Sequence, residues 1–184
     1  MSSVYQLKVA LQDTKPPIWR RVLVAGDSTL GELHDVLQAA FGWQDSHLHE
    51  FEIDGVRYGM ADLEDLEDPP LDEHGARLVD VAAEGARFAY VYDFGDYWQH
   101  RVTVEKVTDS REQPRVPALL GGKRACPPED CGGTGGYVEF LEAIADPDHE
   151  EHDSILEWVG GEFDPEAVDA AGFDKRLKLQ TAPR

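Results

Sequence analysis

The chain has 184 residues, which fits one domain, and 41% of them are hydrophobic, which is enough for a packed core. Acidic residues outnumber basic ones by 37 to 17, and the formal net charge is −20 at pH 7. Because Lys and Arg neutralise phosphate backbones, this balance argues against non-specific nucleic-acid binding. The sequence has no continuous apolar run long enough for a membrane span, and its first residues lead us to expect no secretory signal. With only two cysteines, we expect a cytoplasmic protein without a disulfide framework.

The N-terminal third predicts two strands, a helix and a third strand. Alternating or continuous apolar residues favour strands over residues 4–11, 18–24 and 48–53. Thr29 and Glu32 form a possible capping box, after which apolar residues recur at helical spacing as far as Phe41. Gly42 ends this helix, and Asp54-Gly55 is a strong turn signal after the third strand.

The rest of the chain predicts a loop, a hairpin and a helical end. Residues 62–74 are acidic and interrupted by proline, which favours a solvated loop. The remaining elements expected are a short helix over 78–83, a hairpin over 87–92 and 99–107, and helices over 137–144, 154–159 and 165–179. In the last helix Asp164 is the expected N-cap and Pro165 the first helical residue.

These elements predict one α+β domain over residues 1–184. Residues 1–107 would form its sheet-rich core, 108–135 a Pro/Gly-rich loop, and 136–180 a helical part. The order strand, strand, helix, strand is β-grasp-like, and the hairpin indicates a mixed or antiparallel sheet.

Candidate functional groups fall in three fragments of the chain, at residues 47–49, 90–100 and 126–131. Strand alternation places His47 and His49 on the apolar face of the third strand, and His100 on the apolar face of the hairpin. His34, on the flank of the first helix, is a further member of the same pocket. A buried imidazole needs a partner, because an unsatisfied polar group costs about 1–3 kcal/mol.

Three interpretations of these residues remain open. The first is a bound zinc ion, with ligands from Cys126, Cys131 and two of His47, His49 and His100. The second is purely structural: the core histidines bond to the acidic residues of the turn, Asp93 and Asp96, and the two thiols only pack. The third is a disulfide across the Cys-Pro-Pro-Glu-Asp-Cys loop.

Several motifs in combination resemble the plasmid pRiA4b ORF-3-like family. They are Ile18-Trp19-Arg20-Arg21, Leu33-His34, Phe41-Gly42-Trp43, His47-Leu48-His49, Tyr92-Asp93-Phe94-Gly95-Asp96, and Cys126-Pro127-Pro128-Glu129-Asp130-Cys131. The resemblance runs from about residue 5 to about residue 177 and implies a compact α+β domain associated with mobile or accessory genetic elements. Some relatives carry a TnpR-like, resolvase-type label. A recombinase needs arginines gathered around a phosphate, whereas Arg20 and Arg21 are adjacent on a strand and point to opposite faces.

Two functions follow as hypotheses. The first is a non-catalytic binding module for a protein or small-molecule partner, presenting exposed aromatic residues at Trp19, Trp43, Tyr97 and Trp98. The alternative is a small zinc-dependent hydrolase, in which a metal-bound water attacks the substrate. Its candidate catalytic residues are Asp93, Asp96, His100 and Glu129, with Asp96 or Glu129 as the general base.

Overall fold

The computed structural model describes residues 3–60, 68–109 and 115–181. Its strands are β1 (Ser3–Leu11), β2 (Trp19–Ala25), β3 (His49–Ile53), β4 (Val56–Gly59), β5 (Leu71–Asp72), β6 (Arg87–Tyr92), β7 (Trp98–Asp109) and β8 (Ala118–Lys123). Its helices are α1 (Leu30–Phe41), the 3-10 helix η1 (Glu73–Gly75), α2 (Leu78–Val81), α3 (Gly133–Ala145), α4 (His152–Trp158) and α5 (Phe173–Gln180). None of the helices in these ranges is long and apolar enough to cross a membrane.

The described strands form a single sheet in the order β5-β4-β3-β6-β7-β1-β2-β8. Neighbouring strands are antiparallel, except for the parallel pair β4 and β5. The predicted α+β class, the β1-β2-α1-β3 start and the β6-β7 hairpin are therefore confirmed. In space the hairpin lies between β3 and β1, so it joins the two halves of the sheet.

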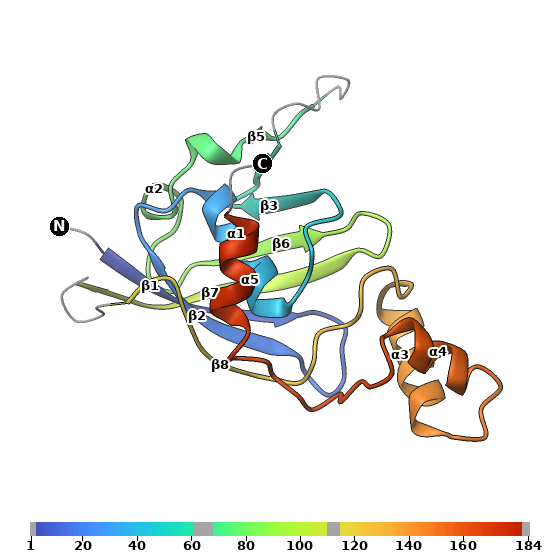
Figure 1. Ribbon diagram of the computed structural model, residues 1–184. Coiled ribbons are helices and arrows are strands. Elements are labelled where there is room, and N and C mark those ends of the chain that lie inside the picture. The colour runs from blue at the N-terminus through green and yellow to red at the C-terminus, as the bar shows by residue number, and fades with distance from the viewer. Residues whose placement is uncertain (1–2, 61–67, 110–114, 182–184) are drawn as a thin grey trace.

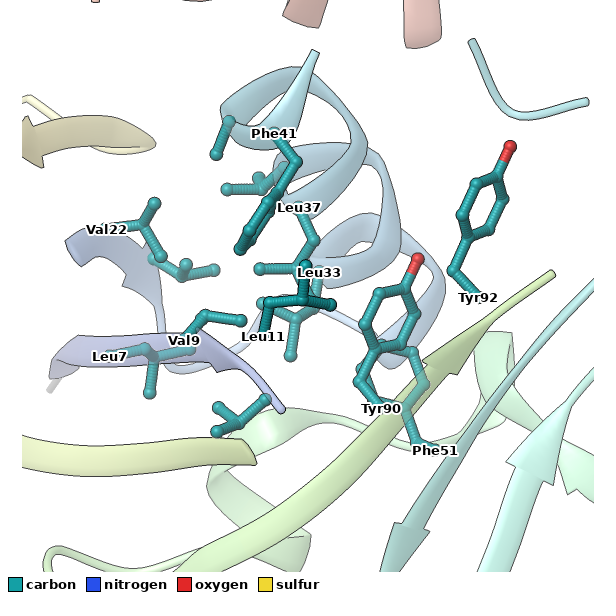
Figure 2. Packing of buried hydrophobic residues seen from close by; sticks show 14 of the residues in the cluster. Leu7, Val9, Leu11, Val22, Leu33, Leu37, Phe41, Phe51, Tyr90 and Tyr92 are labelled. Atoms are coloured by element: carbon teal, nitrogen blue, oxygen red, sulfur yellow. The ribbon is translucent and has the colours of Figure 1, made fainter. Parts of the chain in front are cut away.

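The core lies between the sheet and α1. Thr29 begins this helix with the predicted capping box, and Gly42 ends it in the left-handed conformation, at φ 93°. Figure 2 shows Leu33, Leu37 and Phe41 pointing from α1 toward the apolar side chains of β1. Because residues of β1 alternate in burial, one face of that strand meets α1.

The helices after β8 pack at two places (Figure 1). α5 lies against α1, where Arg176 Nε donates to Ala39 O at 2.8 Å and Gln180 Nε2 donates to Trp43 O at 3.1 Å. α3 and α4 lie together at one side of the sheet, joined by an edge-to-face contact of Phe140 with Trp158. α5 therefore extends the layer formed by α1.

The helix predicted over residues 165–179 is wrong in its first half, because α5 begins only at Phe173. Asp164 does start a turn, since its Oδ1 accepts the N–H of Glu166 at 2.9 Å. The carboxylate of Asp169 then accepts the N–H of Gly172 at 2.8 Å. Such side-chain hydrogen bonds compete with the helix, and the chain leaves the helical path between the two turns.

The loop predicted over residues 108–135 is also corrected, because it contains β8. This strand pairs with β2 and forms an edge of the sheet, with Gly122 opposite Arg20. A Cβ on Gly122 would lie 2.7 Å from Trp19 O and 2.8 Å from Arg20 Cδ. This glycine therefore allows a close approach of two strands, whereas in the sequence it looks like a loop residue.

The solvated loop predicted over residues 62–74 is wrong for its last residues, while its first part, to residue 67, lies outside the described residues. Leu71 and Asp72 form β5, and the 3-10 helix follows at once. Glu73 is only 2% exposed. An acidic residue is almost never buried without a partner, and the partner here is a histidine of β3.

Candidate functional site

Four polar side chains converge where three loops meet at one end of the sheet. His47 lies between α1 and β3, Asp93 follows β6, and Glu129 and Asp130 precede α3. The Nε2 atom of His47 lies 3.0 Å from Asp130 Oδ1, 3.6 Å from Glu129 Oε2 and 3.7 Å from Asp93 Oδ2. This nitrogen is buried, yet it forms no hydrogen bond of acceptable geometry with any described residue. We call these four residues the His47 cluster.

Neighbouring groups hold the carboxylates of the His47 cluster in place. Glu129 Oε1 accepts the N–H of Gln44 at 2.8 Å and the hydroxyl of Tyr92 at 3.1 Å. Asp93 Oδ1 accepts the N–H of Gly95 at 2.8 Å, which leaves Oδ2 facing His47. Both Asp93 and Asp130 have a positive φ, near 57°, which Asp tolerates better than most residues. The backbone is thus shaped to present these side chains.

A second cluster lies deeper, between α1 and β3. The rings of His34 and His49 stack with centroids 3.4 Å apart and planes 8° from parallel. Asp45 Oδ1 lies 2.9 Å from His34 Nε2, and Glu73 Oε2 lies 2.7 Å from His49 Nε2. The other nitrogen of His34 bonds to the hydroxyl of Tyr90 at 2.8 Å. Each imidazole therefore has its own carboxylate.

His34, Asp45 and His49 each offer one ligating atom within 4.8 Å of the others. Their geometry nevertheless suits a metal poorly. A bound ion lies close to the plane of each imidazole that ligates it, and two parallel rings 3.4 Å apart cannot both meet that condition. Burial also lowers the pKa of His34, which favours a neutral ring. This cluster is a part of the core in which every ring nitrogen except His49 Nδ1 has a hydrogen-bond partner among the described residues.

His100 lies apart from both clusters. Its side chain is fully buried against the rings of Phe41, Trp43 and Tyr90. Nδ1 is 3.2 Å from Tyr90 O, and Nε2 has no hydrogen-bond partner among the described residues. Burial lowers the pKa of His100 to about 3, so the imidazole is neutral near pH 7. It is therefore poorly suited to donate a proton in catalysis.

The two cysteines are free thiols, which leaves no disulfide in this structure. Burial raises the pKa of Cys126 well above its usual value and that of Cys131 to about 12. Among the described residues, neither belongs to a group of three potential metal ligands. The five residues considered as zinc ligands therefore separate, with His47, His49 and His100 in three different surroundings.

The remaining residues that the sequence suggested for the site also have different surroundings. Asp96 Oδ2 accepts the N–H of Gly132 at 3.1 Å, which ties the hairpin turn to the start of α3. Trp43 and Trp98 were expected to be exposed, but they are 2% and 1% exposed because they pack into the core. Tyr97 is exposed, as expected. Trp19 is half-buried, so the two core tryptophans are the part of the predicted aromatic binding surface that is wrong.

Sequence reasoning missed several residues of these clusters. Asp130 was visible in the Cys-Pro-Pro-Glu-Asp-Cys motif but stood out less than its cysteines. Tyr90 and Tyr92 could have been found, because alternation in β6 points them to the same face. Glu73 carried no signal, since it follows a long acidic segment that favours a loop.

Fold and site together define a single-domain α+β protein whose loops gather a histidine and three carboxylates at one end of the sheet. This chain belongs to the plasmid pRiA4b ORF-3-like protein family, whose model matches residues 3–172. It is 43% identical over 180 residues to the uncharacterized protein y4hQ of Sinorhizobium fredii, covering 96% of this chain and 92% of that relative.

A solved structure has the same fold. The crystal structure of MM3350, a protein of unknown function from Methanosarcina mazei Go1, matches with a TM-score of 0.82 and 38% identity. The match covers 93% of this chain and 97% of the other. The names of these two relatives state no activity, so the function of this chain has to be argued from its own site.

Proposed function

We propose that this protein is a binding module that holds a divalent metal ion at the His47 cluster. The observation that carries the proposal is the buried Nε2 atom of His47, which lacks a hydrogen-bond partner among the described residues and faces three carboxylate oxygens. Burying an imidazole nitrogen that has no hydrogen-bond partner lowers the stability of the folded chain. A metal ion would satisfy that nitrogen and neutralise the three acids together.

The distances fit a metal centre. Nitrogen and oxygen ligands bond to zinc at about 2.0–2.2 Å, which separates neighbouring ligand atoms by about 3.0 Å in octahedral and about 3.4 Å in tetrahedral geometry. The three distances from His47 Nε2, at 3.0, 3.6 and 3.7 Å, lie in and just above that range. One imidazole with several carboxylates is a ligand set that suits zinc, manganese or iron. A soft metal ion such as copper(I) would instead prefer the thiols.

Metal titration of the purified protein tests this proposal. After treatment with EDTA and its removal, we expect calorimetry with zinc chloride or manganese chloride to give about one ion bound per chain. His47→Ala and Asp93→Asn should each weaken binding at least tenfold, because each removes a ligand. The double variant Cys126→Ser, Cys131→Ser is the matched control and should bind as the wild type does. Loss of binding in the cysteine variant with retention in His47→Ala would contradict the proposal.

The partner of the module belongs to the same proposal. We infer a small-molecule or protein partner, because the net charge of −20 opposes binding to nucleic acid. Arg20 and Arg21 support this inference, since Arg20 is buried beneath α1 whereas Arg21 pairs with Glu105 on the other face of the sheet. The free thiols fit a cytoplasmic location, and the plasmid in the family description suggests mobile-element association.

A metal-dependent hydrolase is the second candidate, favoured by the open side of the His47 cluster. The side chain of Asp130 is 70% exposed and that of His47 is 27% exposed, so a water molecule could complete the coordination. Glu129 would then be the general base. Zinc-dependent hydrolysis of 4-nitrophenyl acetate or bis(4-nitrophenyl) phosphate, abolished in His47→Ala, would support this function. A zinc-loaded protein without either activity would favour the binding module.

A further inference from the structure

A cavity opens beside the His47 cluster, between the C-terminal end of α1, the cysteine loop and the segment before α5. Its volume is about 520 Å³, in the range of small-molecule sites. Glu129 and Asp130 stand at the boundary between this cavity and the His47 cluster, because they belong to both. The lining also contains Arg20, which belongs to neither histidine cluster.

Arg20 is a buried charge without an acidic partner. The residue is 2% exposed, and no carboxylate of a described residue lies within 4.0 Å of its guanidinium. Nε donates to Ala40 O at 2.9 Å, and Nη1 donates to Trp19 O at 2.9 Å and to Lys123 O at 3.2 Å. The Nη2 group forms no hydrogen bond with a described residue.

The backbone partners explain only part of this arrangement. Arg20 Nε satisfies a carbonyl at the C-terminal end of α1, where a positive charge is favourable. Burial lowers the pKa of Arg20, yet an arginine stays protonated in proteins. Because Arg side chains are rarely buried unless they are paired with an acid, the unpaired charge indicates that something else completes it. Gly122 leaves room for the Arg20 side chain between β2 and β8.

The other charged groups of the cavity are already engaged. Asp169 is held by the N–H of Gly172 and by the guanidinium of Arg176, which lower the pKa of that carboxyl. Glu129 accepts from Tyr92 and Gln44, and Asp130 faces His47. A cation at the His47 cluster would neutralise these last two acids. Arg20 is then the charge in the described lining that has no counter-charge.

The walls near Arg20 are aromatic. Phe41 lies beneath its guanidinium, 5.2 Å from ring centroid to Cζ, and stacks on Trp43. Trp158 and Phe163 line the same cavity from the C-terminal part of the chain, and Trp158 is half-exposed. Aromatic walls around one fixed charge are typical of sites for small organic ligands.

We propose that this cavity binds a small organic anion, whose carboxylate or phosphate group pairs with Arg20 and whose apolar body packs against Trp158 and Phe163. Arginine donors recognise both kinds of anionic group through charge-assisted hydrogen bonds. The inference deepens the proposed binding function by giving the module a ligand class, and it rests on that function only for the neutralisation of Glu129 and Asp130.

The test uses three naphthalene compounds of similar shape. 1-Naphthoate and 1-naphthyl phosphate carry the anionic groups, and 1-naphthamide is the neutral control. Binding to the full chain is measured by calorimetry in EDTA and again with zinc. We expect at least one of the two anions to bind at least tenfold more tightly than the amide, and the better anion identifies the kind of group that the site prefers.

Four variants locate the binding site. Arg20→Lys keeps the charge and should weaken the anion at least tenfold, whereas Arg21→Lys, on the opposite face of β2, should change nothing. Ala167→Trp places a bulky side chain in the exposed rim of the cavity and should block binding. Ala170→Trp, also exposed but outside the cavity lining, is its matched control.

The proposal is overturned if both anions bind no more tightly than 1-naphthamide in EDTA and in zinc. It is also overturned if Ala167→Trp binds the preferred anion as well as Ala170→Trp does. Failure of the cation proposal is a separate result. If no metal binds at His47, anion binding that depends on Arg20 should still be measured in EDTA. Metal binding without anion binding would leave only the cation proposal standing.

Discussion

At the scale of single residues, the histidines of this chain have different surroundings that set different roles. His47 faces carboxylates at a loop junction, His49 pairs with Glu73 in the core, and His100 is enclosed by aromatic rings. Only the first combines an unsatisfied nitrogen with several acids and an opening to solvent. This difference is the reason why we place a metal ion at His47.

His100 predicts a pH dependence of stability. Its pKa is about 3 in the folded chain, whereas an unfolded chain titrates imidazole near 6.5. Between these values the unfolded state binds the proton and the folded state does not, so stability is lost as the pH falls below about 6.5. The expected slope for this residue is up to about 1.4 kcal/mol per pH unit.

Urea unfolding of His100→Gln at pH 7 and pH 5 measures that contribution. We expect the variant to lose less stability between the two pH values than the wild type loses. Val102→Ala, which changes a buried neighbour on the same strand face and adds no titrating group, should be destabilised at both pH values and keep the wild-type difference. An unchanged difference in His100→Gln would show that this residue does not titrate as described.

Residue identity alone could predict part of the site. Alternation along β3 and β7 correctly placed His49 and His100 in the interior. It was wrong for His47, which precedes β3 and whose side chain is 27% exposed. It could not show that the two interior histidines meet different partners, because the partners come from distant segments of the chain. Glu73 is the clearest example: its contact with His49 depends on the path of residues that resemble a solvated loop.

At the scale of elements, local signals were reliable where they act within one element. The capping box at Thr29 and the left-handed Gly42 set both ends of α1 as predicted. The true start of α5 was missed because the carboxylates of Asp164 and Asp169 bond to nearby backbone N–H groups and interrupt the helix. β8 was missed because it depends on its pairing with β2. Tertiary contacts of this kind override local preferences.

The capping box gives a prediction for α1. Thr29 Oγ1 accepts the N–H of Glu32 at 3.1 Å, and the Glu32 carboxylate accepts the N–H of Thr29 at 2.8 Å. Thr29→Ala should lower the free energy of unfolding by about 1 kcal/mol, measured by urea denaturation. Ser28→Ala, at the adjacent position, should have less effect. Equal losses in both variants would mean that the cap contributes nothing specific.

At the scale of the whole molecule, one sheet and the helices on it bring three distant motifs to a common end. The turn after β6, the segment before β3 and the cysteine loop meet there. The hydroxyl of Tyr92 in β6 connects the last two, because it accepts the N–H of Ser46 and donates to Glu129. The cysteines of this loop are half-buried free thiols, while its acids face His47. The family motifs therefore meet in space, although the ligands expected at first were different.

The charge of the whole chain predicts no affinity for nucleic acid. With a net charge of −20, the protein should repel phosphate backbones at every moderate salt concentration. In a mobility-shift experiment we expect no retardation of a 30-base-pair duplex at micromolar protein and 50 mM salt. A shift that weakens steeply as salt is raised would contradict this expectation and revive a role in recombination.

The central claim is a metal ion at the His47 cluster, and anomalous diffraction from crystals grown with zinc tests it most directly. We predict one dominant peak at the zinc edge, about 2.0–2.2 Å from His47 Nε2 and close to oxygens of Asp93, Glu129 or Asp130. The peak should be absent from crystals of His47→Ala. A peak at the sulfurs of Cys126 and Cys131, or none at the His47 cluster, would contradict the account.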